Sequence, residues 1–456
     1  MHPLSIPLSP SHRDAAARVL AASIRTPIHV PFPTARRLRA LVVAVTASFS
    51  AAVTTAGTPA DAPPAAWTKR LEKSLDVVDA EHRADIGVYV RDLESGETAR
   101  YRASETWYLA STVKVPIAIA VLRGVDAGLI DLDSKMTLRA ADYVDGAGLT
   151  NRQRVGAQLS VRFLLEQMII YSDNTASDML IELVGIRNVN HVASEIGGDD
   201  FGRITTLGDV RRLVYGELTP AAERLAGNDL LLLHRQQRDK DRLALLARLT
   251  ETPVAKFRRS SLDEAFSAYY ASGVNSARLS TYGDLLEALA DGEMLSAKQT
   301  DYLLGVMRRT ATGTHRIKAG LLPGAQFAHK TGTQRRRICD SGVIKIAHGM
   351  HVQRVVIAAC ARGELSLERA ERALRDVGVA LCRSGAITRG IPDEPACPPL
   401  SRDEVLSAAV PVAPAVPPAV APAPRAGGNV PASKQRPVAA QPAARPAGSQ
   451  RTDPAR

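Results

Sequence analysis

Cysteine is scarce in this sequence, and no metal-binding pattern is built from it. The 456 residues include four cysteines, and these lie in the C-terminal third. None belongs to a C-x-x-C pair or to a Cys/His cluster with the spacing of a zinc site. We therefore predict that the protein uses no metal ion and no other cofactor. In an exported protein, disulfides between Cys339, Cys360, Cys382 and Cys397 would be permitted.

Two of these cysteines lie at matching places in a predicted hairpin. Residues 337–346 and 353–362 have the pattern of two strands joined by a turn near residues 348–349. Cys339 and Cys360 are almost equidistant from that turn, so they could face each other across the strands. A cross-strand disulfide and two buried free thiols both fit this arrangement.

The positive charge of the chain lacks the distribution expected for a nucleic-acid-binding surface. Of the net charge of +11, residues 1–62 and 399–456 carry +4 each, which leaves +3 for residues 63–398. Because the excess lies mainly in the two ends, it says little about the folded part of the protein. No nucleic-acid-reading motif accompanies it, so we expect no nucleic-acid partner.

An uncharged stretch near the N-terminus is typical of an export signal. Three arginines precede residues 40–60, whose apolar core is 41–53, and small residues follow up to Ala62. This order predicts that residues 1–62 are an N-terminal extension and signal peptide. The stretch is just long enough to span a membrane, so an uncleaved anchor is the alternative. Its Thr, Ser, Gly and Pro content favours a removable signal, and hence a periplasmic or secreted protein with no stable membrane span.

The C-terminal residues 401–456 lack the composition of a packed core. Residues 411–424 consist of Ala, Val and Pro. We predict a disordered, partly polyproline-II tail. An inert appendage and a segment that binds the cell wall or a partner are both compatible with this composition.

Between these ends, residues 63–400 show the periodicities of one folded domain. Apolar residues recur at helical spacing in some segments and alternate in others. Strand patterns occur near both ends of the domain, and helical patterns fill its middle. The predicted elements are a helix at 67–78, strands at 86–90 and 98–102, helices at 161–169 and 285–304, strands from 326, and a helix at 366–382.

The simplest arrangement of these elements is an α+β fold. An antiparallel sheet would be built from N- and C-terminal segments and flanked by the terminal helices. The helices of the middle, about residues 112–310, would form a separate helical lobe. We expect the reacting groups to gather where this lobe meets the sheet, because pockets commonly form at such boundaries.

Three short motifs occur in an order that points to acyl transfer. They are S-x-x-K at 111–114, S-D-N at 172–174 and K-T-G at 330–332. An S-x-x-K pattern should arise about once by chance in a chain of this length, whereas the other two are each rare. Each motif alone could be a helix cap or a turn. Together, in this order, they predict a single active site for acyl transfer.

The first motif supplies a nucleophile and its base. The hydroxyl of Ser111 is a poor nucleophile and needs a neighbouring base. On a helix, the i, i+3 spacing stacks Lys114 over Ser111. A lysine packed in an apolar site loses proton affinity and can act as that base. In the second motif, the Ser172 hydroxyl can relay the proton to a leaving nitrogen, and the Asn174 amide can hold a substrate carbonyl and the lysine.

The third motif predicts a binding site for an anionic substrate. Lys330 supplies positive potential, and the hydroxyls of Thr331 and Thr333 can bind a carboxylate. Gly332 lets the backbone approach closely. The Thr333 N–H, paired with the N–H of Ser111, would form an oxyanion hole.

Two sets of arginines flank this strand. Arg316 is a candidate second carboxylate anchor, with a solvated surface arginine as the alternative. The run of three arginines at 335–337 is expected to be a solvated loop rather than part of a site.

The sequence resembles the class A serine β-lactamases, and more widely the penicillin-interacting serine enzymes, over about residues 67–385. The segments that carry the resemblance are 111–116, 121–128, 171–176, 316–320 and 329–333. This resemblance implies a β-lactamase/D,D-peptidase-like fold, and a reaction in which a β-lactam acylates Ser111 and is then hydrolysed. We expect a monomer acting on a small β-lactam or a peptidoglycan-derived substrate.

One part of the family pattern is missing. Class A enzymes carry an E-x-x-L-N loop after S-D-N, and its glutamate activates the water that releases the acyl group. Here Glu217 is the nearest candidate for that base and Asp209 a weaker one, and an insertion of about residues 219–274 follows. The alternatives to a β-lactamase are therefore a D,D-peptidase-like or other penicillin-interacting hydrolase, and a protein that binds β-lactams or peptidoglycan and deacylates poorly.

Overall fold

The computed structural model describes residues 66–363 and 366–401. The predicted signal peptide and the predicted tail lie outside these residues. Among the described helices, none combines the length and the apolar character that crossing a bilayer requires.

Five strands form one antiparallel sheet in the order β2-β1-β9-β8-β7. The first strands of the domain join the last ones, because β1 pairs with β9 along its whole length. This confirms the prediction of a sheet built from both ends of the domain. The strands are β1 (Asp85–Asp92), β2 (Thr98–Tyr101), β7 (Gln326–Gln334), β8 (Arg337–His348) and β9 (His351–Arg362).

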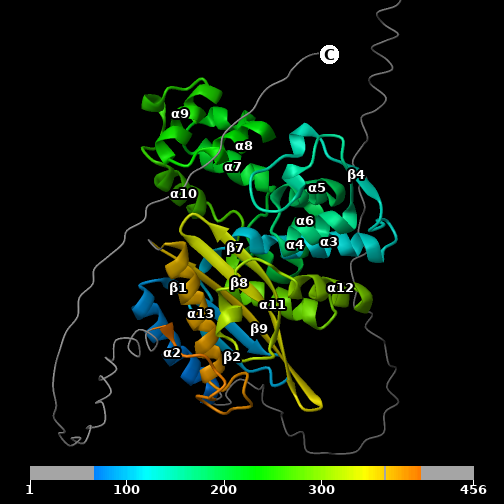
Figure 1. Cartoon of the computed structure of the whole chain (residues 1–456), viewed down its shortest axis with the longest axis vertical. Coiled ribbons are helices and arrows are strands. Elements are labelled where there is room, and N and C mark those ends of the chain that lie inside the picture. Colours follow the sequence, from blue (N-terminus) through cyan, green and yellow to red (C-terminus); the bar gives the residue numbers. More distant parts are fainter. Residues whose placement is uncertain (1–65, 364–365, 402–456) are drawn as a thin grey trace, which may run out of the picture. The chain divides into compact units, whose positions relative to one another are not determined.

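Two terminal helices cover one face of the sheet, and Figure 1 shows α13 lying across the strands. These are α2 (Ala66–His82) and α13 (Leu367–Arg383). Apolar side chains such as Leu71 and Leu374 pack there against Ile357 of β9. Ser366 caps α13 by accepting a hydrogen bond from the Arg369 N–H, as its position before the helix predicts.

The other face of the sheet is continuous with the helical lobe. The helix α11 (Leu279–Ala290) packs on this face, and one apolar core includes Leu286, Val356 and Leu122. The helical lobe is thus present, as predicted, and it shares its apolar core with this face of the sheet. The reason is that β8 and β9 are apolar on both faces, so each face must be covered. The other lobe helices outside the insertion are α3 (Lys114–Asp126), α4 (Val161–Ile170), α5 (Asn174–Val184), α6 (Ile186–Gly197), α7 (Leu207–Gly216) and α12 (Ala297–Arg308).

Residues 219–274 fold as helices, in keeping with their charged helical pattern. Their three α-helices are α8 (Gly227–Arg235), α9 (Asp239–Leu249) and α10 (Leu262–Ala271). We call this segment the insertion. In Figure 1 its helices gather beyond the ends of the strands β7 and β8.

Both pairs of cysteines form disulfides. Cys339 and Cys360 are direct partners in the register of β8 and β9, and they are bonded to each other. Of the two possibilities for this pair, the structure thus has the cross-strand disulfide. Cys382 at the end of α13 is bonded to Cys397, which ties the C-terminal segment of the domain to that helix.

Candidate active site

Ser111 lies in a short 3-10 turn, Ala110–Val113, that leads directly into α3. Its side chain is half-buried, so the hydroxyl is accessible. The residue before it, Ala110, has a φ of 49°, which is unusual for a residue with a side chain. Such backbone strain at a nucleophile persists only where the surrounding structure holds it in place.

The amine of Lys114 lies at the centre of the site. Its Nζ is 3.2 Å from Ser111 Oγ and 3.2 Å from Ser172 Oγ. The same atom contacts the Ser172 carbonyl oxygen at 2.7 Å and Asn174 Oδ1 at 2.7 Å. One amine thus joins the first two motifs through three side chains.

The electrostatic surroundings of Lys114 favour a neutral amine. Burial lowers its pKa from the ordinary 10.5 to about 7, although the negative charges of Asp173 and Asp178 act to raise it. A lysine with such a pKa is partly unprotonated near neutral pH and can take a proton from Ser111.

The three residues of the second motif lie at a tight turn between α4 and α5. Ser172 has a φ of 62°, and this left-handed conformation turns the chain sharply before α5 begins. Asp173 caps α5 by accepting from the Ala176 N–H and also accepts from the Thr150 N–H, so its role is that of a structural acceptor. Asn174 donates its amide to the Asp145 carbonyl oxygen at 2.6 Å, which fixes the orientation of the amide.

The third motif lies on the edge strand β7, directly beside the nucleophile. A Cβ added at Gly332 would lie 2.5 Å from the Leu109 carbonyl oxygen and 3.3 Å from the Ser111 nitrogen. Only glycine permits this close approach of β7 to the Ser111 turn. The approach brings the backbone of β7 to the position expected for one side of an oxyanion hole.

Lys330 is fully buried, and its Nζ donates to the Thr331 carbonyl oxygen at 2.9 Å. Burial lowers the pKa of Lys330 well below its ordinary value, and the nearby charges of Lys114 and Arg316 lower it further. An anionic group bound beside this amine would favour its charged form and raise the pKa again.

Arg316 is buried and held against the same strand, so it is not a solvated surface residue. Its Nη2 donates to Thr333 Oγ1 at 2.7 Å, and its Nη1 donates to the carbonyl oxygens of Gly332 and Cys339. Glu371 of α13 contacts Arg316 Nε at 3.2 Å. Thr331 Oγ1 lies 2.5 Å from Thr312 Oγ1. The structure therefore brings Arg316 and both threonines of the motif to one place.

Replacing Arg316 by Ala should weaken substrate capture and destabilise the fold. The change removes a positive charge beside Thr333 and leaves buried carbonyl oxygens without a donor, which costs about 1–3 kcal/mol of unfolding free energy. We expect KM for a penicillin to rise more than kcat falls, measured together with thermal unfolding. Arg308→Ala at the exposed end of α12 is the control. An unchanged KM would show that Arg316 is only structural.

Glu217 is not brought to this group of residues. It ends α7 at its C-terminal side, and its carboxylate pairs with Arg259 Nη2 at 3.1 Å. The contacts of α7 with Asp178 and Asp145 come from earlier in the helix, from the N–H groups of Leu207 and Gly208 and from Arg211. From Gly208 to Glu217 the helix extends ~14 Å. Asp209 pairs with Arg212 at 2.9 Å. The role of deacylation base for Glu217 remains a prediction.

Asp178 is a residue near Lys114 that the motifs do not include. It lies four residues after Asn174 on α5, and its carboxylate accepts from the N–H groups of Leu207 and Gly208 at 2.6 and 2.8 Å. Burial raises the pKa of Asp178 to about 7, while these two N–H groups lower it. The i, i+4 spacing from Asn174 is a signal that could have identified it.

Asp145 supports the site from the loop before α4. Its carboxylate contacts Arg211 Nε at 2.7 Å and His234 Nδ1 at 3.1 Å. Burial would raise the pKa of Asp145, but these two partners hold it well below its ordinary value. No local pattern marks this contact, because the three residues come from separate segments. Within the described part of the chain, no group of three or more His, Cys, Asp or Glu could hold a metal ion.

Comparison with known proteins agrees with this geometry. A model of the β-lactamase enzyme family matches residues 69–384. The chain belongs to this family. The ROB-1 β-lactamase of Haemophilus influenzae is 32% identical over 148 residues, which are 32% of this chain and 48% of that enzyme. A β-lactamase of Streptomyces fradiae is 31% identical over 223 residues, which cover 42% of this chain and 71% of the other.

The match to ROB-1 thus spans about half the length of that relative. Among solved structures, a mutant of PBP-A in an acyl-enzyme complex with penicillin G aligns with a TM-score of 0.53 at 24% identity, over 71% of this chain and 99% of that one. This likeness shows that the β-lactamase family member described here has the fold of the β-lactamases and penicillin-binding proteins.

Proposed function

We propose that this protein is a serine hydrolase of the β-lactamase type, in which a β-lactam acylates Ser111. The observation that carries the proposal is the buried amine of Lys114, which lies 3.2 Å from both Ser111 Oγ and Ser172 Oγ. The amine is in contact with both oxygens that must exchange a proton during acylation, and its lowered pKa suits that task.

In the proposed step, Ser111 Oγ attacks the carbonyl carbon of the β-lactam and its proton passes to Lys114. The tetrahedral oxyanion is stabilised by the backbone N–H groups of Ser111 and Thr333. The ring C–N bond then breaks, and the proton returns from Lys114 through the Ser172 hydroxyl to the leaving nitrogen. The product is an ester on Ser111, which water hydrolyses to a free acid.

The substrate class follows from the charges along β7. Arg316 supplies a positive charge beside Thr333, and the buried amine of Lys330 on the same strand would become charged when an anionic group binds next to it. This arrangement suits a substrate that carries a carboxylate beside its reactive amide, as penicillins and cephalosporins do.

A chromogenic cephalosporin tests the proposal when colour and intact mass are followed together. Sustained colour supports a hydrolase that turns over. A single burst of colour with a persistent mass adduct supports acylation without efficient release. The absence of both signals would exclude β-lactams as substrates.

A second candidate function is a penicillin-interacting protein that acts on peptidoglycan peptides or remains acylated. It is favoured by the position of Glu217, which pairs with Arg259 and leaves the deacylation base unassigned. Without a placed base, release of the acyl group should be slower by about 10²–10⁴-fold.

Replacing Glu217 by Gln tests whether this residue is the deacylation base. Because the carboxylate of Glu217 is paired with Arg259, we expect the lifetime of the acyl-enzyme to stay within about twofold of the original. The measurement is the decay of the mass adduct after excess antibiotic has been removed. An adduct that persists only in the Glu217→Gln variant would instead assign the water-activating role to this residue.

We also propose that the protein is exported, to the periplasm or beyond the cell. The two disulfides support an oxidising compartment, because cytosolic disulfides are rare. Fractionation of producing cells, followed by the N-terminal sequence of the mature chain, tests this. A full-length chain in the cytosol would exclude it.

A further inference from the structure

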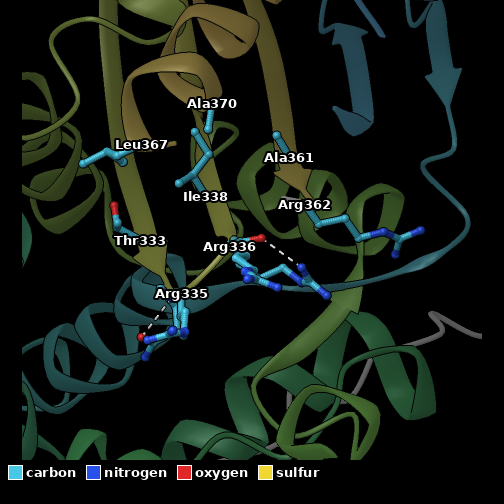
Figure 2. Close-up of a pocket in the computed structure, with 11 residues that line it drawn as sticks. Thr333, Arg335, Arg336, Ile338, Ala361, Arg362, Leu367 and Ala370 are labelled. Carbon is cyan, nitrogen blue, oxygen red and sulfur yellow. Dashed lines mark hydrogen bonds between the residues drawn. The ribbon is translucent and has the colours of Figure 1, made fainter. Parts of the chain in front are cut away.

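The β7–β8 turn is held by charged residues of the insertion. Arg335 Nη2 contacts Asp239 Oδ2 at 2.7 Å, and Arg335 Nε also contacts Asp263. Arg336 Nη2 lies 2.9 Å from Asp263 Oδ2. Figure 2 shows Arg335 at the end of β7, directed away from the apolar residues Ile338 and Ala370. The run is thus a turn, as expected, and Arg336 is exposed, but Arg335 is half-buried in these ion pairs.

Aromatic contacts reinforce this attachment. The hydroxyl of Tyr270 on α10 donates to the Arg335 carbonyl oxygen at 2.7 Å, and the Arg337 guanidinium lies 4.7 Å from the centre of the Tyr270 ring. Tyr270 and Tyr269 also pack on Tyr108, which lies three residues before Ser111, with ring centres 4.7 and 5.6 Å apart. The helix α10 thus contacts both the end of β7 and the segment that leads to the nucleophile.

The insertion has a second attachment on the lobe side of the site. His234 of α8 contacts Asp145, whose carbonyl oxygen accepts the amide of Asn174. Near the start of α8, a Cβ added at Gly227 would lie 2.4 Å from the Tyr143 carbonyl oxygen, so the two segments touch. The insertion therefore connects the loop that supports Asn174 with the turn that follows Thr333.

The direction of β7 indicates which part of a substrate would lie next to the insertion. Lys330 and Thr331 lie at the end where the carboxylate binds, and the strand then runs past Thr333 towards Arg335. At the rise of a strand, Arg335 lies ~7 Å beyond Thr333. A β-lactam whose carbonyl is held beside Thr333 would extend its acyl substituent along this distance towards the insertion.

We propose that the insertion closes this end of the substrate site and selects against bulky acyl substituents, and that Arg335 with Asp239 and Asp263 holds it in place. This inference rests on the proposed function. Arg335 acts as a positioning residue, because its charge is engaged with the two carboxylates and is not needed for the reaction. The ion pairs are partly exposed, so their loss should loosen the insertion without unfolding the domain.

The test compares acylation by two penicillins with the same ring system, 6-aminopenicillanic acid and a penicillin with a 2,6-dimethoxybenzoyl substituent. The rate of adduct formation is followed by intact mass, so the rate of deacylation does not matter. In the Arg335→Ala variant, we expect acylation by the bulky compound, relative to the small one, to rise by about fivefold or more. Asp239→Asn combined with Asp263→Asn should have the same effect, because it removes the other half of the same contacts.

The control variant is Arg238→Ala. It breaks the exposed ion pair between Arg238 and Asp241, whose atoms lie 2.7 Å apart within the insertion, and leaves the contacts of Arg335 intact. Its preference for the two compounds should equal that of the original protein. If Arg335 instead bound substrate directly, only its own replacement would change the preference, and the proposed positioning role would be overturned.

Hydrogen exchange of the α10 amides provides a readout that does not depend on the reaction. Arg335→Ala should raise exchange in residues 262–271, and Arg238→Ala should not. Faster exchange with an unchanged preference between the penicillins would overturn the selective role of the insertion. If neither compound acylates the original protein, the proposed function fails, and the selective role falls with it. Unchanged exchange in Arg335→Ala would overturn the attachment itself.

Discussion

Replacing Ser111 by Ala should abolish the covalent adduct with any β-lactam, at a loss in acylation rate of at least about 10³-fold. The physical reason is that the side chain supplies the attacking oxygen, and the other hydroxyl in contact with Lys114, that of Ser172, is placed to pass a proton on. Lys330 and Arg316 remain in place, so reversible binding of the antibiotic should persist. Intact mass measures the first effect and ligand-induced thermal stabilisation the second.

The matched control is Ser194→Ala on the surface of α6, where the hydroxyl only contacts the His191 carbonyl oxygen. It should form the adduct at the original rate. If the Ser111→Ala variant formed the adduct to the same extent as the original protein, another residue would be the nucleophile and the proposed mechanism would be wrong.

Replacing Lys114 by Met should lower the acylation rate by about 10²–10⁴-fold, the usual contribution of a general base. The original protein should show an acylation rate that rises with pH through about 7. Below that pH the amine is protonated and cannot accept the Ser111 proton, and above it the neutral amine predominates. In the methionine variant this rising limb should disappear. The measurement is the pH profile of adduct formation, with thermal unfolding as a check on folding.

Asp178 is the second group whose pKa is shifted to about 7, so it provides the decisive comparison. Its negative charge raises the pKa of Lys114. Asp178→Asn should therefore move the rising limb to lower pH and retain it. A limb that survives in Lys114→Met but is lost in Asp178→Asn would reverse the assignment of the base. Lys318→Met, at an exposed position, should leave the profile unchanged.

Much of the fold could be predicted because its signals are local. The alternation of apolar residues marked β1, two strand-like segments about a turn marked β8 and β9, and the position of Ser366 marked the start of α13. The nearly equal distances of Cys339 and Cys360 from the turn predicted that they could face each other across the strands, and the structure decided between a disulfide and two free thiols. The packing of α11 on the sheet could not be predicted, because it depends on which faces of β8 and β9 the helices cover.

In the candidate site, too, contacts between residues close in the sequence could be predicted and contacts between distant segments could not. The contact of Lys114 with Ser111 follows from helical spacing over three residues, which the sequence contains in full. Asp178 could have been found from its spacing to Asn174. Glu217, by contrast, was chosen from its place in the chain, and in the structure its carboxylate pairs with Arg259 of the insertion.

By itself, the sequence determined the motifs, their local geometry and the family, because residues a few positions apart are constrained by one helix or strand. Only the tertiary structure decided what surrounds them. Arg316 against Thr333, Asp145 between Arg211 and His234, and Arg335 between Asp239 and Asp263 join segments far apart in the chain. Such contacts depend on how buried charges find partners when the helices pack, and no local spacing encodes that choice.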